Sequence, residues 1–327
     1  MAEELGNRGL HERLAKSREE LLTDGFKIVV VGEFSRGKST FINALLGSRL
    51  LPAKTNPTTT TINRIVYGEK QRYILHYRHE QEAKEITAEE FRRIVAVESF
   101  GDEEEAMVEY QKAIAGIGEI AYTELQYPLS LCKSGIEVID TPGTNDLDQA
   151  REEITLRFIP QADAAIMLLS AEQILARSEL DFIQERILKN DIQKVFFVVN
   201  FKDRLSEPGD GDRICALARE QLSAIVDKPK VFLVSSKAAL NFRRAEKGES
   251  MKGMVPDTIE ESGFVEMEDA LSDYLIQERA EAKLEKYRRR LSRLGKELIR
   301  ESIEIRRQNL GVDVRVLEEQ ITVDLAV

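Results

Sequence analysis

The chain has 327 residues, enough for one large domain or two modest ones with a sizeable apolar core. It is 42% apolar and 32% charged, as globular proteins usually are, and no apolar run reaches the roughly 20 residues that span a bilayer. The net charge of −11 argues against nucleic acid as the main partner, since it provides no domain-wide basic field. Cys132 and Cys215 follow no metal or redox spacing, so we expect buried thiols in a reducing cytosol.

The first part of the chain predicts one helix followed by an alternation of strands and helices. Residues 1–24 have leucines at helical spacing, and "TDGF" ends that pattern. Helix-like stretches at 178–188 and 212–226 then separate runs that are rich in β-branched and aromatic residues. Such runs are typical of strands buried on both faces, and they lie at 27–32, 135–140, 164–170, 194–201 and 230–236. The pattern predicts an α/β fold, with a mostly parallel sheet flanked by helices.

Two further segments are expected at the margin of this sheet. Residues 62–67 and 72–77 alternate weakly and resemble an edge hairpin. Residues 80–116 are acidic and favour helix, which indicates an insertion outside the minimal sheet.

The last part of the chain, from residue 264 to about 310, is predominantly helical. Apolar residues recur there at four-three-four-three-four spacing, which is typical of a bundle or coiled coil: Ala280, Leu284, Tyr287, Leu291, Leu294 and Leu298. Residues 281–310 contain ten Lys or Arg against five Glu, which suits a solvated helix face or, alternatively, an anionic lipid surface. We expect the stripe to pair with residues 1–24, or the chain to be part of a longer protein.

The segment "GEFSRGKS" fits G-x-x-x-x-G-K-[ST] between a strand and a helix, the context that this phosphate-binding motif requires. Gly32 and Gly37 permit backbone angles that turn successive N–H groups toward phosphate, and the following helix adds its positive end. Lys38 is expected to reach the β- and γ-phosphates, and Ser39 to bind Mg²⁺. A glycine-rich surface turn is the structural alternative.

"DTPG" follows the strand at 135–140, so Asp140 lies at a carboxyl end near the phosphate loop. There it can hold a Mg²⁺-bound water, while the Gly143 N–H senses the γ-phosphate. The segment alone would fit a plain turn. After a phosphate loop, the nucleotide-binding interpretation is favoured.

"NFKD", which starts at Asn200, ends the strand at 194–201 and indicates guanine. The Asp203 carboxylate can accept hydrogen bonds from the ring N–H and amino group of guanine, whereas adenine would leave it desolvated and unpaired. In "SSKAAL", the backbone of Ser236 and Lys237 is placed to meet the guanine oxygen. We therefore predict GTP and GDP as the ligands.

The order phosphate loop, threonine cluster, DTPG, NxxD and SSK resembles the GTPase G-domain family over residues 27 to about 242. Two departures stand out. The base motif has Phe201 second and Lys202 third, where the family pattern is [NT]-K-x-D, so either side chain would have to replace the usual lysine. Thr144 follows DTPG, where Ras-like GTPases have a water-orienting glutamine, so hydrolysis must be organised differently.

"GEFSRGKSTFINALLG…LLP…NPTTTTINRIVYG" closely resembles bacterial dynamin-like proteins, relatives of dynamins and mitofusins. The resemblance implies a GTPase domain at 25–263 and an α-helical neck formed by residues 1–24 and 264–327, with the second part truncated. Ser35 and Lys38 would then polarise the phosphates. Thr59, chosen from four threonines by its distance to "RIVYG", would close over Mg²⁺ and position the attacking water. A plain loop is the alternative reading of that threonine cluster.

The resemblance also implies a set of residues around the nucleotide. Mg²⁺ would be bound through Ser39, Thr59 and Asp140. Arg36 is expected either to stabilise transition-state charge, as an arginine finger does, or to project into solvent. The residues expected to contact GTP or GDP are Gly32, Ser35, Arg36, Gly37, Lys38, Ser39, Thr40, Asp140, Gly143, Asn200, Lys202, Asp203, Ser236 and Lys237.

Three functions are compatible with these observations. The first is a mechanochemical GTPase in which nucleotide-dependent homodimerisation through the G-domain face, or pairing with a second dynamin-like protein, swings the neck. It would be a cytoplasmic protein that associates peripherally with anionic membrane through elements mostly outside this chain. The second is a regulatory or assembly GTPase acting on ribosomes or RNA, and the third is a slow-turnover, GTP-dependent interaction protein.

Overall fold

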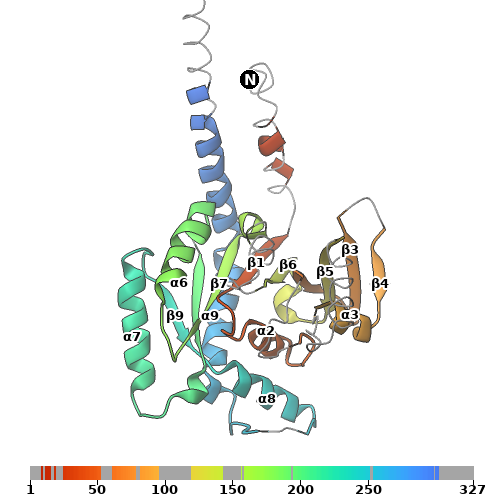
Figure 1. The fold of residues 1–327 in the computed structure, drawn as a ribbon, viewed down its shortest axis with the longest axis vertical. Coiled ribbons are helices and arrows are strands. Elements are labelled where there is room, and N and C mark those ends of the chain that lie inside the picture. Colours follow the sequence, from red (N-terminus) through yellow and green to blue (C-terminus); the bar gives the residue numbers. More distant parts are fainter. Residues whose placement is uncertain are drawn as a thin grey trace, which may run out of the picture. The chain divides into compact units, whose positions relative to one another are not determined.

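The computed structural model divides the chain into two compact units, Gly25–Ala282 and Met1–Asp24 with Lys283–Val327. Figure 1 shows the larger unit, in which helices surround a central sheet. The residues that the structure describes are 9, 12–15, 18–19, 25–52, 61–78, 82–95, 119–142, 156, 158–192, 194–250, 253–297 and 299–301.

The described residues of the larger unit form one nine-stranded sheet in the order β4-β3-β5-β2-β6-β1-β7-β8-β9. Strands β6, β1, β7, β8 and β9 run parallel to one another, while β2 is antiparallel to β6. Their bounds are β1 Phe26–Val31, β2 Asn63–Tyr67, β3 Arg72–Tyr77, β4 Lys84–Ile86, β5 Ile120–Tyr127, β6 Ile136–Asp140, β7 Ala164–Ser170, β8 Val195–Asn200 and β9 Lys230–Leu233.

The sheet is covered on both faces, which explains why its central strands are almost entirely apolar. Strand β1 sends Ile28 and Val30 into the core that contains α2 (Lys38–Leu46), α8 (Ser236–Glu246) and α9 (Phe264–Gln277). Its alternate residues face a second core formed with the helices α6 (Arg177–Phe182) and α7 (Asp210–Ser223). The remaining helical segments are α3 Ala88–Val95, the π-helix η3 Ile183–Ile187 and the 3₁₀ turns η1 Ser130–Cys132, η2 Ile159–Gln161, η4 Leu188–Asn190, η5 Lys202–Arg204 and η6 Glu260–Ser262.

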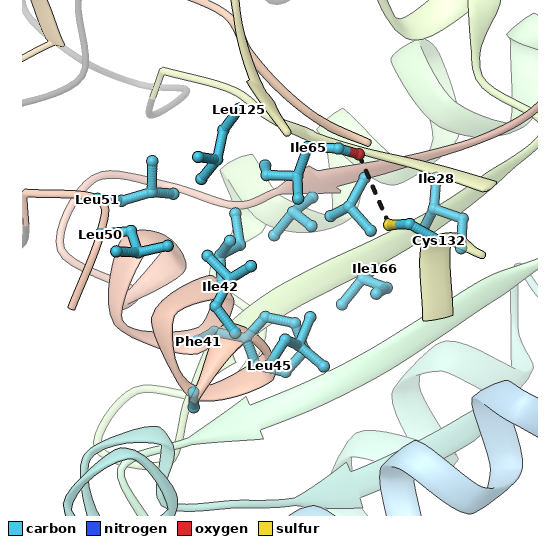
Figure 2. Packing of buried hydrophobic residues seen from close by; sticks show 14 of the residues in the cluster. Ile28, Phe41, Ile42, Leu45, Leu50, Leu51, Ile65, Leu125, Cys132 and Ile166 are labelled. Atoms are coloured by element: carbon cyan, nitrogen blue, oxygen red, sulfur yellow. Dashed lines mark hydrogen bonds between the residues drawn. The ribbon is translucent and has the colours of Figure 1, made fainter. Parts of the chain in front are cut away.

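Figure 2 shows the first of these cores, in which Phe41, Ile42 and Leu45 of α2 pack against the sheet. Cys132 lies in the same core, and its Sγ donates to the Ile65 carbonyl oxygen. Burial raises the pKa of the Cys132 thiol to about 12. This cysteine is therefore a packing residue with little thiolate character at neutral pH.

The strand predictions from continuous apolar runs are confirmed, since they match β1, β6, β7, β8 and β9. The expected hairpin between β2 and β3 is wrong. Strand β5 lies between them, parallel to β2 and antiparallel to β3. Strands β5, β3 and β4 lie beyond β2, so the sheet extends past the edge that sequence proximity indicated.

The larger unit continues to Ala282, and the domain boundary expected at residue 264 stays a prediction. Helix α9 belongs to the larger unit, since its apolar face is buried in the same core as α2. That face consists of Phe264, Met267, Leu271, Tyr274 and Leu275.

The smaller unit combines the two ends of the chain, and within it Arg13 forms an ion pair with Glu297 at 2.8 Å. The expected stripe is divided between two environments. Tyr287 and Leu294 are buried, whereas Leu284 is 61% and Leu291 45% exposed. The stripe is therefore not one continuous buried seam over the described residues.

Candidate functional site: a nucleotide-binding edge of the sheet

The predicted site residues converge because they follow strands whose carboxyl ends lie at one edge. The phosphate loop connects β1 to α2, Asp140 ends β6 and Asn200 ends β8, and the SSK segment follows β9. Strand β1 lies between β6 and β7, where the connections turn to opposite sides of the sheet. In open α/β sheets, ligands bind in the crevice at such a position.

The phosphate loop has the backbone that its glycines were expected to allow. Gly32 has φ 151°, Ser35 has φ 61° and Gly37 has φ 82°. A Cβ on Gly32 would lie 2.6 Å from the carbonyl oxygen of Leu168, so a side chain there would collide with β7. Helix α2 begins directly after Gly37, so its positive N-terminal end lies at the phosphate loop.

Lys38 lies inside this loop and is almost fully buried. Its Nζ donates to the carbonyl oxygens of Gly32 and Glu33 at 2.9 and 3.0 Å. These contacts hold the ammonium at the loop's centre, where phosphate oxygens would be its partners when nucleotide binds. Ser39 and Thr40 follow Lys38 in the first turn of α2 and are partly exposed.

Asp140 is completely buried beside the phosphate loop. Burial raises the pKa of its carboxyl to about 6, although the hydrogen bond from Asn63 and the charge of Lys38 both oppose the shift. Asn63 Nδ2 donates to Oδ2 at 3.0 Å, and Thr123 Oγ1 donates to Asn63 Oδ1 at 2.6 Å. The first residues of β2 and the middle of β5 thus orient the carboxylate, which sequence reasoning missed.

The other carboxylate oxygen of Asp140 fits a role toward a cation. Oδ1 is buried and has no hydrogen-bond partner among the described residues. An ionised buried carboxylate is costly without a counter-charge, and Mg²⁺ prefers oxygen ligands that include only one or two carboxylates beside phosphate and water. No group of three His, Cys, Asp or Glu side chains in the described part of the chain could hold a metal alone. Asp140 and Ser39 therefore fit a Mg²⁺ that arrives with phosphate.

The base motif is connected to the phosphate loop by hydrogen bonds. Asn200 Nδ2 donates to the Arg36 carbonyl oxygen at 3.0 Å, and its Oδ1 accepts from the Ser236 N–H at 3.1 Å. The Ser236 N–H is thus engaged by Asn200, and its contact with guanine stays a prediction. Asp203 Oδ1 accepts from the Ser235 hydroxyl at 2.6 Å. Ser235, which sequence reasoning did not single out, also caps α8.

A pocket of about 510 Å³ lies beside these residues. It is lined by the expected residues Thr40, Asn200, Asp203 and Lys237, together with Phe201, Arg49, Arg204 and others. Lys202 does not line it. That residue lines a separate groove of about 790 Å³ formed with α7 and α9. Of the two candidate replacements for the usual lysine, only Phe201 faces the base pocket.

Arg36 does not project into solvent, because two carboxylates bind its guanidinium. Nε donates to Glu179 Oε1 at 2.9 Å and Nη2 donates to Glu33 Oε2 at 2.8 Å. Glu33 also accepts from the Ser178 hydroxyl at 2.5 Å. The Arg36 side chain is 13% exposed and that of Glu179 is fully buried. The other two predicted catalytic residues, Thr59 and Gly143, lie outside the described residues, as does Thr144.

This fold and site define a phosphate-loop nucleotide-binding protein of the G-domain type. Residues 28–203 match the model of the dynamin family. The chain belongs to the dynamin family, whose members are GTPases and bind guanine nucleotides. Among the described residues, no helix has both the length and the apolar character needed to cross a bilayer.

Relatives and a solved structure agree with this assignment. The chain is 30% identical to a bacterial dynamin-like protein of Nostoc punctiforme over 90% of this chain and 43% of that protein. It is 25% identical to dynamin-like protein 1 of Campylobacter jejuni over 86% of this chain and 42% of that one. An oligomerised bacterial dynamin pair, described as a mechanism for long-range sensing and tethering of membranes, shares the fold (TM-score 0.57, 23% identity, 98% of this chain and 48% of that one). The chain thus spans less than half of these proteins.

Proposed function

We propose that this protein binds and hydrolyses GTP with Mg²⁺, and that nucleotide-dependent dimerisation through the GTPase face drives movement of a helical neck that remodels membrane. The observation that carries the nucleotide proposal is the arrangement of Lys38, Asp140 and Asp203 at one edge of the sheet. An ammonium in a phosphate loop, a buried carboxylate with a free oxygen and a base pocket with its own carboxylate together suit a guanine nucleotide.

Each site residue would have a role in hydrolysis that follows from its position around the phosphate groups. The loop N–H groups and Lys38 bind phosphate oxygens, and Ser35 lies at the exposed, left-handed turn where a side chain can meet the bridging oxygen. Ser39, Asp140 and Thr59 would hold Mg²⁺, which when bound neutralises phosphate charge. The Thr59 main chain would position the attacking water, and the Gly143 N–H would bind the γ-phosphate. The roles of Thr59 and Gly143 rest on the motifs alone, because both lie outside the described residues, whereas the other roles rest on the motifs and on the geometry around them.

The neck and membrane parts of the proposal have separate support. Both ends of the chain belong to one compact unit, and Arg13 pairs with Glu297 there, which supports a helical neck built from the two ends. The similar bacterial pair is oligomerised and tethers membranes, according to its description. We propose accordingly that the protein works in the cytoplasm, pairs with itself or with a second dynamin-like protein, and associates peripherally with anionic membrane through elements mostly outside this chain.

The deciding experiment is the rate of GTP hydrolysis per molecule, measured over a wide range of protein concentration. A dimerisation-activated GTPase turns over faster per molecule as dimers form, and Lys38→Ala should abolish the activity. A constant, appreciable rate would contradict the dimerisation mechanism and leave a simple GTPase. Binding of GTP with negligible turnover at every concentration would favour the slow-turnover interaction protein. Family membership and the acidic charge disfavour a ribosome-acting GTPase.

A further inference from the structure

We infer that the aromatic ring of Phe201 is the surface on which the purine base stacks, in place of the lysine stem found at this position in the usual motif. This inference rests on the proposed function, because it assigns a role inside the same guanine-binding pocket. Phe201 would contact the flat face of the base, whereas the Asp203 carboxylate would accept hydrogen bonds from its edge.

The backbone at Phe201 provides the first argument. Its φ of 71° and ψ of 33° lie in the left-handed region, which a bulky side chain rarely adopts because Cβ approaches the following carbonyl. Such conformations persist where the surroundings enforce them, often at functional sites. Here the Lys202 N–H donates to the Val234 carbonyl oxygen and the Arg204 N–H donates to that of Phe201, both at 3.0 Å. The turn is thereby fixed.

The conformation has a direct consequence for which side chain reaches the nucleotide. Phe201 lines the pocket that contains Thr40, Asp203 and Lys237. Lys202 lines the separate groove between α7 and α9. The second residue of the motif, Phe201, therefore lines the expected base pocket, whereas the third residue, Lys202, does not.

The neighbours of the ring fix it in that position. A Cβ on Gly37 would lie 3.5 Å from Cζ of Phe201, so the ring lies against the end of the phosphate loop. The Arg204 guanidinium carbon lies 4.3 Å from the ring centroid, within the range of a cation–π contact. Arg204 is itself held by an ion pair with Glu172 at 2.5 Å. A ring fixed beside the loop and bordering the pocket suits a planar base.

Stacking predicts a characteristic pattern of ligand dependence. Contact between a base and an aromatic ring contributes to affinity for any base, because every base has a π-face. Loss of the ring should therefore lower the affinity for guanine and adenine nucleotides by the same factor. The affinity for ligands that have no base should not change. Loss of the Asp203 carboxylate should instead change the ratio of guanine to adenine nucleotide affinity.

The experiment measures dissociation constants of GDP and ADP, and of inorganic pyrophosphate as the probe without a base, for the full chain. Phe201→Leu keeps an apolar side chain without the ring and should weaken both nucleotides by roughly 10-fold while leaving pyrophosphate unchanged. Phe201→Tyr should retain the affinity of the unaltered protein. Lys202→Ala is the matched neighbour and should leave all three constants within about twofold, because it lies in the other groove.

Three outcomes would overturn the inference. They are unchanged nucleotide affinity in Phe201→Leu, an equal loss for pyrophosphate, which would mean that the ring only supports the loop, and a larger loss in Lys202→Ala. Failure of the proposed function would be distinguishable, because the unaltered protein would then bind no GDP and Lys38→Ala would change nothing. Detectable GDP binding by the unaltered protein makes any failure specific to Phe201.

Discussion

The guanidinium of Arg36 in the phosphate loop is bonded to the carboxylate of Glu179, 143 residues later in the chain, at an Nε–Oε1 distance of 2.9 Å. Glu179 lies in the first turn of α6, and its second oxygen accepts from the Ala176 N–H at 2.9 Å. Burial raises the pKa of the Glu179 carboxyl, although Arg36 opposes the shift. The phosphate loop is thus tied to the start of α6 by a buried charged contact.

Removing the charge of Glu179 should destabilise the protein. In Glu179→Gln the buried guanidinium keeps only Glu33 as a charged partner, so we expect a loss of about 2–4 kcal/mol in the free energy of unfolding. Asp181→Asn is the matched control on the same helix, because its ion pair with Arg177 is exposed and should contribute less than about 0.5 kcal/mol. Urea unfolding of both variants measures the difference. An equal loss of unfolding free energy in the two variants would show that the Arg36–Glu179 pair contributes no more to stability than an exposed ion pair.

The catalytic proposal for Arg36 makes a different prediction. Arg36→Ala should lower turnover by about 10³-fold while GTP affinity changes by less than about threefold, since an arginine finger acts mainly on transition-state charge. The necessary comparison is Glu179→Gln, which disturbs the same contact but keeps the guanidinium. If Arg36 only connects the phosphate loop to α6, Arg36→Ala and Glu179→Gln should lower turnover by a similar factor. The affinity for GTP should then fall as well.

The central part of the fold could be predicted from sequence because its strands are buried on both faces. Strands such as β7, in which every residue is buried, leave a continuous apolar run. Strand β5 leaves no such run, because it alternates between a core and an outer face. Its position between β2 and β3 depends on long-range pairing, so the expectation that neighbours in sequence form a hairpin failed.

The candidate site divides in the same way. Lys38, Asp140 and Asp203 belong to motifs with fixed spacing, and these could be found directly. Asn63 and Glu179 act through contacts with residues far away in the chain, and no local pattern marks them. Whether Phe201 or Lys202 faces the base pocket depends on the left-handed backbone conformation of Phe201. The sequence does not predict that conformation, because the residue is not a glycine.

The pKa of Asp140 predicts how stability and Mg²⁺ binding depend on pH. Its folded-state value of about 6 exceeds the ordinary 3.8, so the stability contributed by the protonated form is complete below pH 3.8 and is lost as pH rises through 6. Because one pKa unit corresponds to about 1.4 kcal/mol, the loss is on the order of 3 kcal/mol. Asp140→Asn keeps an acceptor for Asn63 and should be the more stable protein at pH 7.5 without nucleotide.

Urea unfolding at pH 5 and pH 7.5, without Mg²⁺, tests this prediction. Asp140→Asn should reduce the difference in the free energy of unfolding between pH 5 and pH 7.5. Asp212→Asn, which alters an exposed carboxylate on α7, should leave that difference unchanged. The affinity for Mg²⁺ with nucleotide should fall below about pH 6 in the unaltered protein, because the carboxyl must lose its proton to bind a cation. An unchanged pH dependence in Asp140→Asn would contradict the assignment.

The two adjacent serines after β9 provide the last test, because they differ in what their hydroxyls bind. Ser235 Oγ donates to Asp203 and accepts from the Ala238 N–H at 3.1 Å, so it both orients the base carboxylate and caps α8. Ser236 Oγ is buried without a hydrogen-bond partner among the described residues. Ser235→Ala should therefore cost about 1–2 kcal/mol of stability and reduce the preference for GDP over ADP, whereas Ser236→Ala should be neutral or stabilising. Urea unfolding together with GDP and ADP titrations separates the two effects, and a Ser236→Ala variant that loses base preference as strongly as Ser235→Ala would contradict the role given to the Ser235 hydroxyl.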